Sequence, residues 1–232
     1  MTTSQSGENL IKARILDVRR RMKLAAQNVG RDVDEIKLMA VTKNVAPEYV
    51  NIAIGQGIKL LGENRAQELI LKHNSYNLDG VDIHFIGHLQ SNKVKKIIDK
   101  VSMIESVDSE RLAAEISRCA LKINRQMPIL LEVNVGAEKT KSGFAPSEIF
   151  QAARAISKMP GVRIKGLMAI PPKENVFYYF KKIRGICIDI SRKKMDNVSM
   201  DFLSMGMSAD FEQAIACGAN IVRIGGLIFK NI

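Results

Sequence analysis

Lys43 is the residue whose type and position could most directly do chemistry. It follows the apolar run of residues 36–41 and precedes the loop of residues 44–47. A lysine amine attacks a carbonyl only when it is deprotonated, and partial burial against apolar walls lowers the pKa of a lysine toward that state. Lysines that end a strand usually only carry their charge into water. An amine at the mouth of a buried strand nevertheless meets the requirement of Schiff-base chemistry with an aldehyde cofactor.

A second group of residues, near the end of the chain, is suited to hold a phosphate. Ser208 stands at the start of a predicted helix, and Gly225 and Gly226 leave their backbone N–H groups free of obstruction by a side chain. Each motif alone has an ordinary interpretation, as a helix cap or a glycine turn. In eight-stranded α/β barrels, the loops after strands seven and eight are a frequent phosphate site. Ser208 and the two glycines would follow those two strands in such a fold, so the two motifs together favour phosphate binding.

Arg223 lies within the last apolar run, between Val222 and Ile224. If strand alternation holds, Arg223 points into the barrel while its two neighbours face the helices. An arginine inside a barrel needs an acceptor. A carboxylate of the protein and a ligand's ring nitrogen or phosphate are both compatible with the sequence.

These residues need a scaffold that brings distant segments together. Short apolar and β-branched runs alternate with longer amphipathic segments to the end of the chain. The predicted strands are residues 37–42, 60–62, 83–87, 103–107, 129–135, 164–170, 201–204 and 222–224. The predicted helices between them are residues 47–54, 66–73, 92–98, 109–122, 146–158, 176–194 and 209–216. This alternation predicts an α/β fold, a (β/α)8 TIM barrel formed by one domain over residues 1–232, with an open doubly wound sheet as the main alternative.

A helix is also predicted before the first strand, over residues 9–28, because its apolar residues fall on one stripe. It covers the place where an eighth outer helix would lie, and residues 1–8 are expected to be flexible. Chemistry in a barrel belongs to the loops that follow the strands. The loop segments that carry polar or glycine residues there are residues 63–65, 88–91, 139–143, 206–208 and 225–226.

Composition argues against several other classes of protein. The chain begins without a basic stretch followed by an apolar run, and no window approaches the ~18 apolar residues of a membrane span. Cys119, Cys187 and Cys217 stand far apart, which fits a reducing cytoplasm and indicates neither disulfides nor zinc. We predict no metal, and a core or pocket-edge role for His84. The net charge of +11 is dispersed and Trp is absent, so we expect no specific nucleic-acid partner. We also expect a monomer without a membrane partner.

Seven stretches of the sequence, in order, carry a family resemblance. They are Ala40-Val41-Thr42-Lys43, Leu61-Gly62-Glu63-Asn64, His84-Phe85-Ile86-Gly87-His88-Leu89-Gln90-Ser91-Asn92-Lys93, Lys141-Ser142-Gly143-Phe144, Gly166-Leu167-Met168-Ala169-Ile170, Ser204-Met205-Gly206-Met207-Ser208-Ala209-Asp210 and Val222-Arg223-Ile224-Gly225. Together they resemble the pyridoxal phosphate homeostasis proteins, also called YggS-like proteins or proline synthase co-transcribed homologues. The resemblance covers nearly the whole chain and implies a barrel like the N-terminal domain of alanine racemase.

The resemblance implies a binding site for pyridoxal 5'-phosphate (PLP). The implied cofactor-binding residues are Lys43, Asn64, Ser208, Arg223, Gly225 and Gly226. Lys43 would carry PLP as an internal aldimine, and Arg223 would face the pyridine nitrogen. An arginine in that place disfavours ring protonation and so weakens the electron sink that PLP enzymes need. The resemblance therefore implies a protein that stores PLP or delivers it to apoenzymes, and no substantial catalysis.

Two positions depart from the family pattern. The family commonly has Thr where this chain has Gly226, so one hydroxyl contact to the phosphate is missing. A lost hydrogen bond to a charged group costs about 1.5–3 kcal/mol when water does not replace it. Lys230 stands where a glycine is usual, and it adds a cation near the expected phosphate site.

Two alternative functions remain open. A PLP-dependent amino-acid racemase would need bases on both faces of the substrate carbanion. Lys43 could serve one face, but the tyrosine base of alanine racemase comes from an additional β domain, which we do not expect in this chain. The other alternative is a basic nucleic-acid-associated protein that only retains the cofactor pocket. We expect negligible racemisation and no RNA binding that persists at physiological salt.

Overall fold

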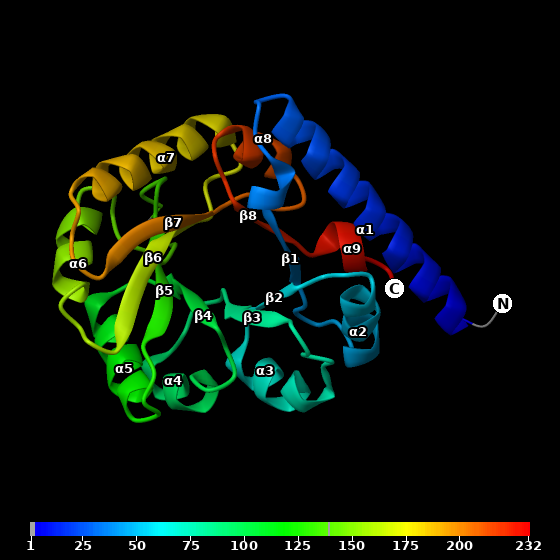
Figure 1. Ribbon diagram of the computed structural model, residues 1–232, viewed down its shortest axis with the longest axis horizontal. Coiled ribbons are helices and arrows are strands. Elements are labelled where there is room, and N and C mark those ends of the chain that lie inside the picture. The colour runs from blue at the N-terminus through cyan, green and yellow to red at the C-terminus, as the bar shows by residue number, and fades with distance from the viewer. Residues whose placement is uncertain (1–2, 139) are drawn as a thin grey trace.

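Eight parallel strands form a closed barrel in the part of the chain that the computed structural model describes, residues 3–138 and 140–232. Figure 1 shows the barrel end-on, with the helices around its outside. The strands are β1 (Lys37–Val41), β2 (Leu60–Glu63), β3 (Asp82–Phe85), β4 (Met103–Val107), β5 (Met127–Val133), β6 (Val162–Ala169), β7 (Val198–Ser204) and β8 (Ile221–Ile224). The α-helices are α1 (Thr3–Gln27), α2 (Pro47–Gly55), α3 (Ala66–Lys72), α4 (Ser91–Ile97), α5 (Glu110–Leu121), α6 (Ile149–Ile156), α7 (Val176–Arg192), α8 (Phe211–Ala216) and α9 (Gly226–Phe229). Two 3-10 helices, Val33–Glu35 and His73–Ser75, precede β1 and follow α3.

The pairing of β1 with β8 closes the sheet and confirms the predicted barrel over the open alternative. Met39 is in register with Arg223, and Ala40 with Ile224. Because all eight strands are parallel, their carboxyl ends lie at one end of the barrel. Residues that follow different strands can therefore form one shared site, as predicted.

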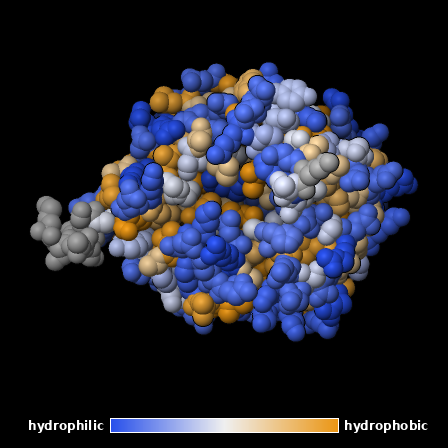
Figure 2. Space-filling view, turned by 180° about the vertical axis from the view of Figure 1, so that it is seen from behind, coloured by the Kyte–Doolittle hydropathy of each residue, from blue (hydrophilic) through white to orange (hydrophobic). Residues whose placement is uncertain are grey.

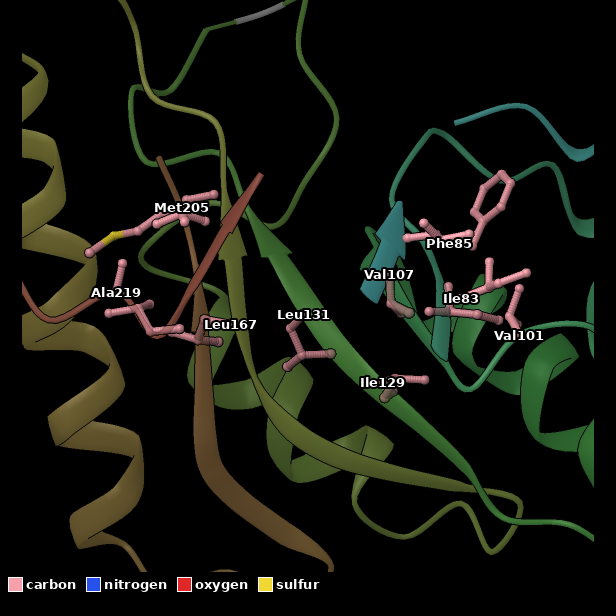
Figure 3. Close-up of a cluster of buried hydrophobic side chains, with 14 of the residues drawn as sticks. Ile83, Phe85, Val101, Val107, Ile129, Leu131, Leu167, Met205 and Ala219 are labelled. Carbon is pink, nitrogen blue, oxygen red and sulfur yellow. The ribbon is translucent and has the colours of Figure 1, made fainter. Parts of the chain in front are cut away.

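Alternation along the strands divides the apolar residues into two layers. Outward-facing residues such as Ile129 and Leu131 of β5 and Leu167 of β6 belong to the large core between the barrel and the helices (Figure 3). Inward-facing residues form smaller clusters inside the barrel. One cluster contains Met39, Leu60, Ile86 and Ile221, and the other contains Met103, Leu130 and Met168. The barrel is therefore a packed core up to the level of its mouth.

Helix α1 covers the outer side of the barrel beside β8 and β1, as predicted. It packs against α8, α2 and α9, and its residues Ile11, Ile15 and Val18 are buried. The helix begins at Thr3 and not at Asn9, so the segment of residues 1–8 that was expected to be flexible is helical from Thr3 onward. Residues 1–2 lie outside the described residues.

The structure departs from the predicted boundaries where burial is incomplete. Strand β7 begins at Val198 and not at Asp201, because its first residues are half-buried and so lack the continuous apolar run of a central strand. Helix α6 begins only at Ile149, three residues after Pro146. Helix α9 was not predicted, since its four residues are too few to show a helical period.

No helix in the described ranges combines the length and apolar character needed to cross a membrane.

Figure 2 shows the molecule from the side opposite to Figure 1. A hollow lies near the centre of this face, and both hydrophilic and hydrophobic surface borders it.

Candidate functional site

The six predicted site residues all lie at the carboxyl end of the barrel or just inside it. Lys43 follows β1, Asn64 follows β2, and Ser208 follows β7. Arg223 is the third residue of β8, and the two glycines come directly after that strand. We call this end of the barrel, bounded by these residues, the barrel mouth.

Lys43 lies in the turn that follows β1. It lies two residues beyond Val41, the last residue of β1, whose side chain packs against the cluster inside the barrel. The Thr42 side chain is buried and donates a hydrogen bond of 2.6 Å to Oε1 of Glu63, which fixes the end of β1 against β2.

The Lys43 side chain is exposed, and the partial burial that sequence analysis expected is wrong. The reason is the turn itself. The extended backbone of β1 ends at Val41, and Lys43 belongs to the turn together with Asn44, which has a φ of 58°. The Asn44 N–H donates to Oε2 of Glu68 in α3 at 2.9 Å. The buried position at the end of β1 therefore belongs to Thr42, and Lys43 stands at the rim.

Arg223 points into the barrel, and its neighbours Val222 and Ile224 belong to the outer core, as alternation predicted. Nη1 donates to Oγ of Ser204 at 2.8 Å, and Nη2 donates to the carbonyl oxygen of Ala169 at 3.0 Å. Both acceptors are neutral, and Arg223 forms no ion pair within 4 Å among the described residues. Burial lowers the pKa of Arg223, and nearby carboxylates, Glu105 first, raise it.

Ser208, Gly225 and Gly226 are brought together by the ends of β7 and β8. The backbone N–H of Leu227 points at Oγ of Ser208 at 3.4 Å. A Cβ built on Gly226 would lie 3.9 Å from the same oxygen, so the glycine faces the hydroxyl directly. A Cβ on Gly225 would lie 3.3 Å from Val41, which places Gly225 beside the end of β1. One hydroxyl and the first backbone N–H groups of α9 thus gather where an anion is expected.

Asn64 is held over the mouth by a close backbone approach. A Cβ on Gly87 would lie 2.0 Å from the carbonyl oxygen of Asn64, so only glycine fits beneath it. The Oδ1 atom of Asn64 is buried and has no hydrogen-bond partner among the described residues. Asn64 borders a cavity of about 260 Å³ whose wall also includes Ile86, Glu132 and Lys141. A buried amide oxygen without a partner is a place where a ligand donor fits.

Glu132 was missed by the sequence analysis. It lies near the end of β5, two residues after Leu130, which belongs to an inner cluster. Burial and the Asp108 carboxylate raise the pKa of Glu132 to about 7, against the opposing effects of Arg223 and His88. The signal was present, because Glu132 is a charged residue at an inward-facing position of an apolar strand.

A buried chain of polar side chains beneath the mouth was also missed. Nδ1 of His84 lies 2.6 Å from Oε1 of Glu105, and Oγ of Ser204 donates to Oε2 of Glu105 at 2.5 Å. The expected core role of His84 is confirmed, because the residue is buried and bonded to a carboxylate. The sequence shows Glu105 as a charged residue within an apolar strand, but it does not show that Ser204 of β7 is its partner.

The remaining predicted positions lie at the rim. Lys141 forms an ion pair with Glu138 and also points at the carbonyl oxygens of Ile170 and Pro171. Lys139, which was named with the same loop, lies outside the described residues. Lys230 is exposed at the end of α9. A separate cavity of about 510 Å³ lies at the other end of the barrel, between α1 and the first residues of β1 and β2, and none of the six predicted site residues lines it.

Comparison with known proteins places this geometry in a family. The model of the alanine racemase N-terminal domain matches residues 17–231. A pyridoxal phosphate homeostasis protein of Aquifex aeolicus is 41% identical over 93% of this chain and 96% of its own. The protein of the same name from Escherichia coli K12 is 33% identical over 95% of this chain and 96% of its own.

Solved structures agree with this relationship. PipY of Synechococcus elongatus, determined with PLP bound, is 28% identical and superposes with a TM-score of 0.81 over 94% of this chain and 99% of its own. An alanine racemase of Clostridium difficile is 16% identical, with a TM-score of 0.73 over 94% of this chain and 56% of its own. At that identity the likeness shows the fold alone.

Proposed function

The chain belongs to the alanine racemase N-terminal domain family, among the pyridoxal phosphate homeostasis proteins, and from this premise we propose that it binds PLP at the barrel mouth. The observation that carries the proposal is the convergence of Lys43, Asn64, Ser208, Arg223 and the two glycines on that mouth from four strand ends. An amine, a hydroxyl beside the first backbone N–H groups of α9, and a buried guanidinium match the aldehyde, the phosphate and the ring nitrogen of one molecule.

The residues present fit PLP in three separate respects. The Ser208 hydroxyl and the backbone of Gly226 form a small, uncrowded group for a phosphate, and the Leu227 N–H points at the same hydroxyl. Arg223 carries five N–H donors, of which two donate to Ser204 and to the carbonyl oxygen of Ala169. The partnerless Oδ1 of Asn64 supplies an acceptor at the wall of the cavity.

We propose that Lys43 holds PLP as a Schiff base. PLP supplies an aldehyde, which condenses with a lysine amine and releases one water molecule. Lys43 is suited to this role because it is accessible at the rim, in the turn directly after β1. The turn at Asn44, which Glu68 holds, fixes the backbone from which the Lys43 side chain reaches the mouth.

The proposed role is storage of PLP and its delivery to PLP-dependent apoenzymes, which limits the free aldehyde. Reversible attachment through an amine allows release without degradation of the cofactor. We further propose that the protein acts as a monomer in the cytoplasm. Sedimentation velocity tests the monomer, and fractionation of cells tests the location.

Delivery is tested by mixing the PLP-loaded protein, freed of excess PLP, with the apo form of a PLP enzyme. Wild-type protein should restore the activity of that enzyme, and Lys43→Ala should not. Lys173→Ala is the matched control, because Lys173 is an exposed lysine in the loop after β6. Equal restoration by Lys43→Ala would refute the proposed attachment.

Racemisation is not proposed for this chain, because no tyrosine hydroxyl is seen at the mouth in the described residues. Tyr49 lies in α2, and Tyr178 and Tyr179 lie in α7. The buried hydroxyl of Tyr76 donates to Glu63 at 2.7 Å, and burial together with Glu63 raises the pKa of Tyr76. Interconversion of L- and D-alanine by the loaded protein at an ordinary enzymatic rate would contradict this conclusion.

A further inference from the structure

Four buried side chains from four strands form a continuous hydrogen-bonded chain across the inside of the barrel. His84 of β3 contacts Glu105 of β4, Glu105 accepts from Ser204 of β7, and Ser204 accepts from Arg223 of β8. The three donor–acceptor distances are 2.6, 2.5 and 2.8 Å. All four residues are at most 4% exposed. The chain links strands on opposite sides of the barrel just below the mouth.

The chemistry of each group fixes the direction of these bonds. A carboxylate only accepts hydrogen bonds, so Nδ1 of His84 carries a hydrogen and donates it to Glu105. Ser204 has one hydroxyl hydrogen, which it also donates to Glu105. Only the lone pairs of Ser204 then remain, and they accept from Nη1 of Arg223. The bond to Glu105 therefore orients the Ser204 hydroxyl so that its oxygen accepts from Arg223.

The arrangement holds the guanidinium by one edge. Nη1 is fixed by Ser204 and Nη2 by the carbonyl oxygen of Ala169, so the planar group has one orientation. The acceptors hold two of its five N–H donors. Because Ser204 stands between Glu105 and Arg223, the negative charge is close to the guanidinium without forming a direct ion pair with it.

We propose that His84, Glu105 and Ser204 are positioning residues that orient Arg223 toward the ring nitrogen of PLP. This inference rests on the proposed function, because it assumes that PLP occupies the mouth. It deepens that function by assigning the recognition of the ring nitrogen to a set of residues that do not touch the cofactor. These hydrogen-bonded side chains make the affinity for PLP depend on the ring nitrogen and not only on the phosphate and the aldehyde.

The test compares PLP with an analogue in which the ring nitrogen is replaced by a CH group. The key variant is Ser204→Ala, which removes the acceptor for Nη1. Its matched control is Ser117→Ala, because the buried Ser117 hydroxyl also accepts one hydrogen bond, from the Gly161 N–H at 2.9 Å, but lies in α5 outside the barrel. Dissociation constants of both ligands are measured for each protein.

Wild-type protein and Ser117→Ala should prefer PLP to the analogue by the same factor. Ser204→Ala should lose about tenfold of that preference, which corresponds to about 1.4 kcal/mol, while its affinity for the analogue changes little. A Ser204→Ala protein that keeps the full preference, or that loses affinity for both ligands equally, would overturn the positioning role.

Glu105→Gln provides a second variant if Ser204→Ala does not fold. A glutamine amide can donate to Ser204, which frees the hydroxyl to turn away from Glu105 and ends its fixed acceptor role. The same loss of preference is expected, whereas an unchanged preference would contradict the chain. Failure of wild-type protein to bind PLP would overturn the proposed function and this inference together. Normal PLP binding with an unchanged preference in both variants would overturn this inference alone.

Discussion

Replacement of Glu132 by glutamine should stabilise the protein at neutral and alkaline pH. The folded protein raises the pKa of this carboxyl from its usual value of 4.5 to about 7, first by burial and then by the Asp108 carboxylate. The neutral carboxyl is therefore favoured in the folded state. Glutamine has nearly the same shape and cannot ionise, so it removes the cost of the charge.

The magnitude follows from the difference between the folded and unfolded pKa values. A difference of about 2.5 pH units corresponds to about 3.5 kcal/mol at ~1.4 kcal/mol per pH unit. The Glu132 side chain is only half-buried, and water screens part of this cost, so we expect about 1–3 kcal/mol.

The sign of the pH dependence is fixed by the direction of the shift. Below about pH 4.5 the carboxyl is protonated in both the folded and the unfolded chain, and its ionisation costs the fold nothing. Between about pH 4.5 and 7 the unfolded chain ionises first, so the wild-type protein loses stability relative to Glu132→Gln. Above about pH 7 the difference between the two proteins becomes constant.

Urea unfolding of both proteins at pH 5, 6, 7 and 8 measures this difference. Glu174→Gln is the control, because Glu174 is exposed in the loop after β6. The difference in unfolding free energy between Glu132→Gln and wild type should grow with pH, while that of the control should not. A difference that is independent of pH, or a Glu132→Gln protein that is less stable than wild type at pH 8, would refute the reasoning.

Three glycines give further predictions. Gly226→Ser places a hydroxyl near Ser208 and should tighten PLP binding about tenfold in a direct titration, whereas unchanged binding would show that the loop does not contact the phosphate. Gly87→Ala forces a Cβ to 2.0 Å from the Asn64 carbonyl oxygen and should lower the free energy of unfolding by ~3 kcal/mol. In Gly185→Ala the added methyl group meets nothing within 4 Å on α7, so this change should raise the free energy of unfolding by ~1 kcal/mol. Thermal unfolding measures both variants, and effects of equal sign for Gly87→Ala and Gly185→Ala would contradict the difference in packing at the two glycines.

The sequence predicted the parts of the structure that depend on local pattern. The alternation of apolar runs and amphipathic segments was enough for the closed barrel, since each strand and helix has its own period. Alternation within β8 also predicted that Arg223 points inward between Val222 and Ile224. The parallel topology also predicted that the loops after the strands lie together at one end of the barrel.

The parts that were missed depend on contacts between different strands. The Glu105–Ser204 bond joins β4 to β7, which are not neighbours in the sheet, so no pairing pattern predicts it. The raised pKa of Glu132 depends first on burial and then on Asp108, which follows the neighbouring strand β4. The burial of Lys43 was predicted wrongly, because a turn one residue later decides which side chain of β1 is enclosed.

Attachment of PLP to Lys43 is tested most directly by borohydride reduction of the protein–PLP mixture, followed by peptide mass spectrometry. Our account predicts a reducible absorption band and a single label on the Lys43 peptide, lost in Lys43→Ala and retained in Lys173→Ala. A label spread over exposed lysines, or a specific label that persists in Lys43→Ala, would contradict the account.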